Sequence, residues 1–333
     1  MFELLGACMA LSALFVVRAA GSAGAMVAWR MLRARIESWP AAARARILFG
    51  LGTVPTFVAV LMTFALVVPA YLLHEPSPPR EVVGVRLVGL AAVSALGVAM
   101  ALWRVATRLA ATRRLKAHWK RDAVAINLPG ATLPTYRIRH PFPVIAVVGV
   151  LRPSLFIAEQ LLDELDEAEL AAAISHETGH AVARDNFKRT VMLACRGGAP
   201  FAIPSPSLDR AWSDAAECAA DEYAARADAR RALDLASALV KIARLVPAGL
   251  TPALPAISSA ASGSIDGVAS RIRRLVALAD RSHPIPPGLG PHAWALLRAP
   301  HWLLVAGVAA FAAVPGALAR LHGTVEVVVA MLT

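Results

Sequence analysis

The residues best placed to do chemistry form the segment His176-Glu177-Thr178-Gly179-His180. Four residues on a helix make slightly more than one turn, so His176 and His180 leave the same face and can chelate one metal ion. Neutral imidazole suits zinc, and this HExxH arrangement is typical of zinc metallopeptidases. Glu177 is angularly offset, so it can take a proton from an attacking water without ligating the metal. The segment predicts a zinc site with Glu177 as catalytic base.

A glycine inside this motif argues against a chance pair of histidines. In a helix interior, glycine costs about 1 kcal/mol relative to alanine. We therefore expect a packing or close-approach reason for Gly179.

A catalytic zinc site needs a third protein ligand and keeps its fourth position open. The downstream predicted helix offers four acidic residues: Asp214, Glu217, Asp221 and Glu222. Glu217 and Asp221 are four residues apart and share a face, so one can bind the metal while the other accepts a hydrogen bond from a ligand imidazole. A solvated acidic face is the alternative, but the position one loop after the HExxH helix favours a metal site.

The flanking sequence predicts the elements that position these residues. Pro143–Val150 and Pro153–Ala158 are β-branched runs around a turn and indicate two strands, of which 144–150 is a candidate edge strand for binding substrate backbone. Asp166-Glu167-Ala168-Glu169 is typical of a capping box that opens a helix through about Ala183. Further helices are expected over about 207–227 and from Arg230, with connections at 197–207, 247–267 and 282–291.

Composition indicates a membrane protein. The 333 residues are 57% hydrophobic and 17% charged, whereas about a quarter of a soluble domain is charged. Four stretches approach the length of a membrane span: Leu4–Trp29, which Arg18 interrupts without an assigned role, Ile47–Leu73, Val82–Trp103 and Trp302–Ala319. The net charge of +11 lies mostly beside these runs, which favours an anionic membrane surface over nucleic acid as partner.

Basic residues predict the topology. Five arginines lie between the first two stretches and seven basic residues follow the third, so the positive-inside rule places the N-terminus outside and residues 104–301 in the cytoplasm. No Lys or Arg precedes the first apolar run, so we expect it to be retained as an anchor. Cys8, Cys195 and Cys218 form no CxxC pair, which fits a reducing compartment. The predicted regions are 1–103 (three spans), 104–300 (zinc domain) and 301–333 (last span and tail).

Several segments resemble the membrane gluzincins, a group of zinc metallopeptidases. They are HETGH, AECAADEYAA, VIAVVGVLRPSLFIA, DELDEAELAAAISHETGHAVARDN and RIRRL, within about residues 140–276. The resemblance implies a mainly α integral membrane protein with about four transmembrane helices, and a cytosolic α+β zincin-like domain between the third and fourth. It implies one Zn²⁺ held by His176, His180 and Glu217, with Glu177 as base and Asp221 supporting a ligand from behind.

Two subgroups of this family fit. The antirepressor type, related to the β-lactam sensor-transducers (BlaR/MecR type), matches the span order and the 37 positions between His180 and Glu217. The HtpX type, a quality-control protease, matches the glycine in HETGH better. Drug-sensing members carry a penicillin-binding domain with an acylated serine after the last span. No SxxK follows Ala319, so we do not expect a β-lactam receptor of that kind.

The expected function is a zinc endopeptidase of a bacterial plasma membrane that cuts a cytosolic or membrane-proximal protein, with a transcriptional repressor as one candidate substrate. Its expected partners are this protein or peptide substrate and membrane lipids, without direct nucleic-acid binding. A catalytically silent sensor or scaffold with a structural zinc is the alternative. Tyr136, Tyr223 and His140 are the candidates for stabilising the oxyanion.

Overall fold

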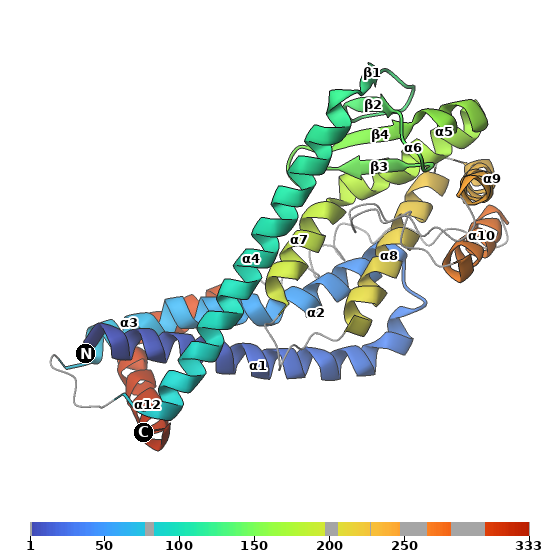
Figure 1. The fold of residues 1–333 in the computed structure, drawn as a ribbon. Coiled ribbons are helices and arrows are strands. Elements are labelled where there is room, and N and C mark those ends of the chain that lie inside the picture. Colours follow the sequence, from blue (N-terminus) through green and yellow to red (C-terminus); the bar gives the residue numbers. More distant parts are fainter. Residues whose placement is uncertain are drawn as a thin grey trace.

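The computed structural model describes residues 2–76, 83–196, 206–226, 228–246, 265–280 and 304–332. The predicted connections at 197–205, 247–264 and 282–291 lie outside these residues. An elongated membrane region occupies one end of the molecule, and a smaller domain with a β-sheet occupies the other (Figure 1).

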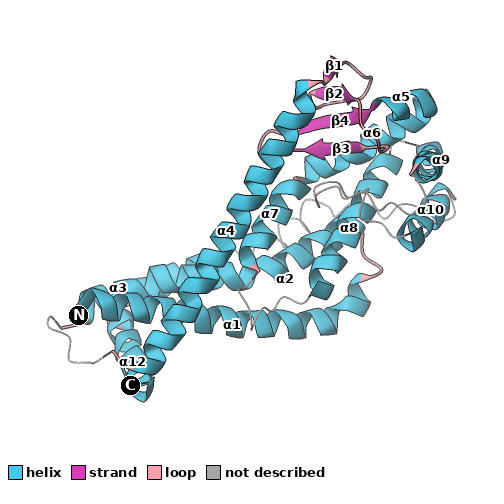
Figure 2. Ribbon diagram, in the orientation of Figure 1, coloured by secondary structure: helices cyan, strands magenta, loops and turns pink. Residues whose placement is uncertain are grey.

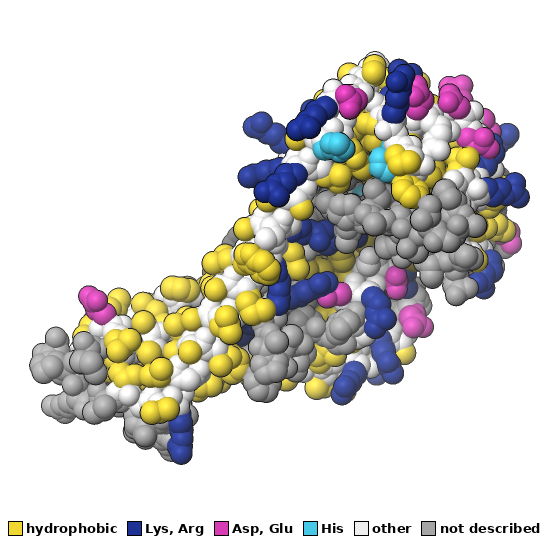
Figure 3. Space-filling model, viewed as in Figure 1, with side chains coloured by type: hydrophobic (Ala, Val, Ile, Leu, Met, Phe, Trp, Pro, Cys, Tyr) yellow, Lys and Arg dark blue, Asp and Glu magenta, His cyan; other side chains and the backbone are white. Residues whose placement is uncertain are grey.

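Three long apolar segments form the membrane region. They are α1 (Phe2–Ile36), α2 (Ala41–Met62), which continues through a π-helical turn (Thr63–Val67) into α3 (Val68–His74), and α4 (Val85–Arg121). Each is long and apolar enough to cross a membrane, in agreement with the first three predicted spans. Figure 3 shows hydrophobic side chains covering this end and charged ones gathered around the sheet.

The fourth predicted span is not a single helix. Within the described residues the chain forms two helices, Leu304–Ala313 and α12 (Ala317–Leu332), which meet at an angle of 96°. The bend contains Pro315, whose ring cannot continue the hydrogen-bond ladder, and Gly316, which has a φ of 74°. Hydropathy alone misses this break because both residues sit within an apolar run. α12 packs against α3 and α4 (Figure 1).

The sheet of the smaller domain has the order β1-β2-β4-β3. Its strands are β1 (Val124–Ile126), β2 (Thr135–Ile138), β3 (Ile145–Val148) and β4 (Ser154–Ala158), and only β2 and β4 are parallel (Figure 2). β3 and β4 confirm the predicted strand pair, with Val147 opposite Leu155. Gly149 is needed at their turn, because it has a φ of 123° and a Cβ there would lie 2.7 Å from the Arg152 carbonyl oxygen.

Helices cover both faces of the sheet. The end of α4 packs on one face, where Trp119 meets Phe156 edge-on with ring centroids 5.4 Å apart. On the other face α6 (Glu167–Ala183) buries Ala173 and Ile174 against Val147 and Ile157. The predicted capping box opens α6, since Asp166 and Glu169 each accept a backbone N–H of the other. The remaining helices are α5 (Glu159–Glu164), α7 (Asp185–Cys195), α8 (Pro206–Ala225), α9 (Ala229–Leu245) and α10 (Ile265–Ala279).

The smaller domain is attached to the membrane region at two places. α4 runs without a break from the apolar region into the domain, through the predicted boundary at residue 103 (Figure 1). α8 packs on α2, where Leu208 and Trp212 share a buried cluster with Leu48. In addition, the Glu222 carboxylate accepts the backbone N–H of Ala41, which opens α2.

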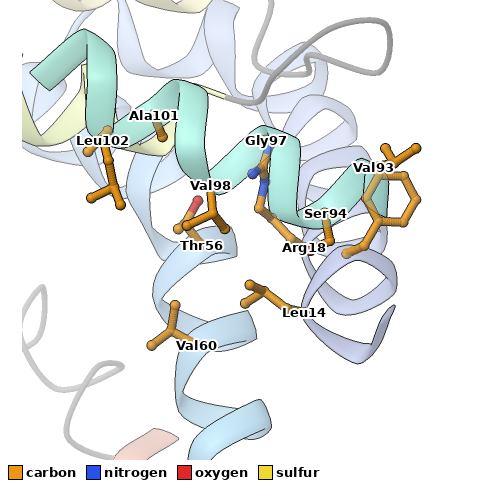
Figure 4. A pocket seen from close by; sticks show the side chains of 12 residues that line it. Leu14, Arg18, Thr56, Val60, Val93, Ser94, Gly97, Val98, Ala101 and Leu102 are labelled. Atoms are coloured by element: carbon orange, nitrogen blue, oxygen red, sulfur yellow. The ribbon is translucent and has the colours of Figure 1, made fainter. Parts of the chain in front are cut away.

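A pocket of about 200 Å³ lies between α1, α2 and α4 (Figure 4). Its walls are mostly apolar, with Thr56, Ser94 and Arg18 as polar exceptions. Arg18 therefore faces the helix bundle rather than lipid, which is the usual place for a charged side chain within a membrane.

Candidate metal centre

The centre lies where α6 and α8 come close together. A Cβ on Gly179 of α6 would lie 3.2 Å from the Ala220 Cα and 3.2 Å from the Tyr223 Cβ, both on α8. Ordinary carbon contacts are about 3.5–4.0 Å, so any larger residue would push the two helices apart. The close approach expected at Gly179 is present.

This contact brings His176, His180 and Glu217 together. Their candidate ligand atoms all lie within 4.8 Å of one another. The Glu217 Oε2 is 3.7 Å from His176 Nε2, and its Oε1 is 3.6 Å from His180 Nε2. The two rings are nearly perpendicular, with centroids 4.8 Å apart. The Nε2 atoms of both rings therefore face a single carboxylate.

A second carboxylate holds each ring from behind. His176 Nδ1 lies 2.9 Å from Asp221 Oδ1, and His180 Nδ1 lies 2.8 Å from Asp185 Oδ2. Both aspartates are buried. Such an acceptor fixes the ring orientation and directs Nε2 toward the middle of the centre, which is how metal-binding histidines are commonly supported.

Arg271 of α10 contacts both Asp221 and Glu217. Its Nη2 and Nε donate to the Asp221 carboxylate at 2.7 and 3.2 Å, and its Nη1 lies 3.4 Å from Glu217 Oε2. Burial would lower the pKa of this guanidinium, but Asp221 and Glu217 raise it above its ordinary value. Arg271 thus anchors the aspartate that orients His176.

Glu177 lies between α6 and the sheet. Its Oε2 accepts the N–H of Val147 on β3 at 3.1 Å, and its side chain is buried. Asn186 of α7 donates to the carbonyls of Val147 (2.9 Å) and Gly149 (3.2 Å). The strand edge, the glutamate and the histidine pair are therefore fixed relative to one another.

The charges of the cluster favour a cation at its middle. Burial would raise the pKa of Glu217, but His180 and Arg271 outweigh it and lower the pKa. Burial likewise would lower the pKa of His180, but Glu217 and Asp185 raise it to about 10. For Glu177 burial dominates, and its pKa is raised. Without a metal, the negative charge of the site thus holds a proton on an imidazole.

The donor set fits a zinc ion. Both Glu217 oxygens are buried and have no hydrogen-bond partner among the described residues. The Arg271 guanidinium, 3.4 Å from Oε2, offsets this cost in part, and a metal ion bound by the carboxylate would remove the rest. Ligands about 2.1 Å from a tetrahedral zinc lie about 3.4 Å apart, close to the observed 3.6 and 3.7 Å.

The other acidic and aromatic candidates lie elsewhere or beside the centre. Glu222 pairs with Arg274 and Ala41 and serves the attachment to α2. Tyr136 and His140 pack with Trp119 on the opposite face of the sheet, which separates them from the centre. Tyr223 lies against Gly179.

Sequence reasoning assigned no role to three residues of the centre. Asp185 and Asn186 follow the HExxH helix directly, after Arg184 turns the chain with a φ of 56°, and this short spacing is a signal that could have identified them. Arg271 lies 95 positions from His176. In the sequence it is part of RIRRL, one of the segments that resemble the gluzincins.

Comparison with known proteins agrees with this geometry. A model of peptidase family M48 matches residues 109–288. No curated protein and no solved structure matches the chain. The matched region begins within α4 and includes α6, α8 and α10, so it contains every residue of the centre.

Proposed function

Because the chain belongs to peptidase family M48, whose members are generally zinc-dependent, we propose that it is a zinc endopeptidase of the membrane. His176, His180 and Glu217 are the proposed ligands of one Zn²⁺. The observation that carries the proposal is the pair of buried Glu217 oxygens, which have no hydrogen-bond partner in the described part of the chain and each face an imidazole Nε2.

Each residue of the centre has a defined task in peptide hydrolysis. Zinc, when bound, supplies a Lewis acid that polarises a carbonyl and lowers the pKa of water. Glu177 takes the proton of the attacking water on its carboxylate and passes it to the leaving nitrogen. Asp221 and Asp185 keep the two rings in the orientation in which Nε2 points toward Glu217. The Val147 N–H holds the Glu177 carboxylate at the edge of the sheet.

An extended peptide is the substrate that this edge fits. β3 pairs only with β4 among the described strands, and the Ala158 N–H donates to the Val144 carbonyl. Since hydrogen bonding alternates along an antiparallel pair, Val144, Ala146 and Val148 face β4, whereas Ile145 and Val147 face the outer edge. At this edge Glu177 and Asn186 bond the N–H and the carbonyl of Val147. A substrate strand added at Ile145 would reach Glu177 next to Val147. This arrangement supports cleavage within a chain.

The membrane helices suggest where the substrate is found. Basic residues flank the domain side of α1 and α4, which favours a cytoplasmic domain at a bacterial plasma membrane. The substrate would then be a cytosolic or membrane-proximal protein. A transcriptional repressor, as for the antirepressor type, and a damaged membrane protein, as for the HtpX type, are both compatible with the centre.

The test compares full-length variants purified in detergent. Glu177→Gln should keep the zinc of the parent protein but lose cleavage, whereas His180→Ala should lose both. Glu167→Gln, which alters an exposed glutamate on the same helix, is the matched control and should retain both. Fragments that appear in cells with the parent protein and not with Glu177→Gln would identify the substrate.

Two results would contradict the proposal. A parent protein that binds no zinc at the centre would refute the ligand set. Zinc bound there without cleavage of any co-expressed protein by the parent would instead support a catalytically silent sensor with a structural metal.

A further inference from the structure

A second group of metal-ligating side chains lies outside the peptidase centre. It contains Glu75, just after α3, and His322 and Glu326 of α12. Their candidate ligand atoms lie within 4.8 Å of one another. The group is at the end of the membrane region where both chain termini lie, far from the sheet (Figure 1).

The distances match those between ligands of one ion. His322 Nε2 lies 3.3 Å from Glu75 Oε2 and 3.3 Å from Glu326 Oε1. Ligands at about 2.0–2.1 Å from a tetrahedral metal ion are about 3.3–3.4 Å apart. His322 and Glu326 are four residues apart on one helix, which is the same chelating spacing as His176 and His180.

The burial of this group calls for a cation. The His322 and Glu75 side chains are 7% and 1% exposed. The Nε2 of His322 and the Oε2 of Glu75 have no hydrogen-bond partner among the described residues. One Nε2 proton cannot satisfy two carboxylates on the same side of the ring, whereas a divalent ion between Nε2 and the two carboxylates satisfies all three ligand atoms and cancels two negative charges.

We propose that Glu75, His322 and Glu326 bind a divalent transition-metal ion of the zinc class. One imidazole and two carboxylates suit such an ion better than a soft copper(I) site or an all-oxygen calcium site. The Glu326 side chain is 40% exposed, so the ion can enter from the surface. Bound there, it fastens α12 to the end of the second span, on the side of the membrane away from the peptidase centre.

Zinc counting on full-length protein tests this site. Glu177→Gln serves as the background in every sample because it prevents self-cleavage. Each protein is stripped with a chelator, titrated with zinc alone, and analysed by mass spectrometry of the metal. We expect two zinc ions per chain, and one after His322→Ala or Glu75→Gln. Either variant should reduce the zinc affinity of the second site by more than about 100-fold, which is more than the loss of a residue that only supports a ligand would cause. His118→Ala, which removes an exposed histidine of α4, should leave two.

The outcomes separate this site from the peptidase centre. One zinc that is lost on His180→Ala, with none lost on His322→Ala, refutes the second site and leaves the proposed enzyme intact. One zinc lost only on His322→Ala supports the second site and refutes the ligand set at the centre. Because Glu75→Gln preserves volume, an unchanged unfolding temperature of its metal-free form excludes misfolding as the cause of a lost ion.

Discussion

Gly179→Ala tests whether the spacing of α6 and α8 sets the metal site. The new Cβ would lie 3.2 Å from the Ala220 Cα, so α8 must retreat by about 0.3–0.8 Å to restore an ordinary contact. Overpacking costs about 1–3 kcal/mol, and the better helix propensity of alanine returns about 1 kcal/mol. The free energy of unfolding should therefore fall by only about 0–2 kcal/mol.

Zinc affinity should fall even if the stability of the metal-free protein is little changed. Gly179 lies beside His180, and Ala220 lies between Glu217 and Asp221, so the displacement acts directly on the ligand distances. Zinc sites tolerate about ±0.2 Å in these distances. We expect at least about 10-fold weaker zinc binding at the centre, or about 1.4 kcal/mol.

Competition with a chelating dye measures the zinc affinity, and thermal unfolding of the metal-free protein measures stability. Gly50→Ala in α2 is the matched control, because an added Cβ there meets no atom within 4 Å. Unchanged zinc affinity in Gly179→Ala, together with unchanged or increased stability, would refute the reasoning, since it would show that the contact does not fix the helix spacing.

Three further predictions follow from the contacts of the domain. Asp185→Asn should weaken zinc binding by about 10–100-fold. Asp221→Asn should also destabilise the fold, by about 3–5 kcal/mol, because it removes the buried charge that Arg271 contacts at 2.7 Å and leaves only the longer contact with Glu217. Zinc titration and thermal unfolding distinguish the two variants. Removing zinc with a chelator should lower the unfolding temperature of the parent protein, and re-addition should restore it. Glu169→Ala should cost about 1–2 kcal/mol at pH 7, because it removes the carboxylate that accepts the Asp166 N–H in the capping box and that pairs with Lys241. Burial would raise the pKa of Glu169, but Lys241 and the other hydrogen-bond donors lower it. The stabilisation by Glu169 is therefore fully present above the pKa of the unfolded chain, about 4.3, and is lost as the pH falls through the lower pKa of the folded protein. Below that pH the unfolding curves of parent and variant should converge.

Local signals in the sequence predicted the parts of the domain that depend on neighbours in the chain. The capping box at Asp166 and Glu169 is confirmed, because both partners lie within one helical turn. The strands around Gly149 are confirmed, because a glycine turn and β-branched residues favour a hairpin locally. The helix that carries Glu217 was also expected, and the structure brings this residue to the histidine pair.

Features that depend on contacts between residues far apart in the chain were not predictable from the sequence. Arg271 reaches Asp221 only through the packing of α10 on α8 and α9, for which periodicity gives no signal. β1 and β2 are strands of three and four residues with mixed exposure, so alternation was too short to indicate them. The partnership of Glu75 with His322 joins residues 247 positions apart. Neither Glu75 nor His322 lies in a sequence motif that indicates a metal site.

The two attachments of the domain make the orientation of the membrane helices relevant to the active site. α4 has 37 residues and a length of about 55 Å, of which about 30 Å fits a bilayer core, so the rest projects as a rigid arm bearing the sheet. A tilt of about 10° moves the tip of this arm, which is about 25 Å long, by about 4 Å, while α8 packs on α2. The hydrogen bond between Val147 and Glu177 spans these two mounts. A change in bilayer thickness that tilts α4 would thus change the geometry of the active site and the peptidase activity. Reconstitution in lipids of graded chain length would measure this dependence. Identical activity in all of these lipids would exclude it.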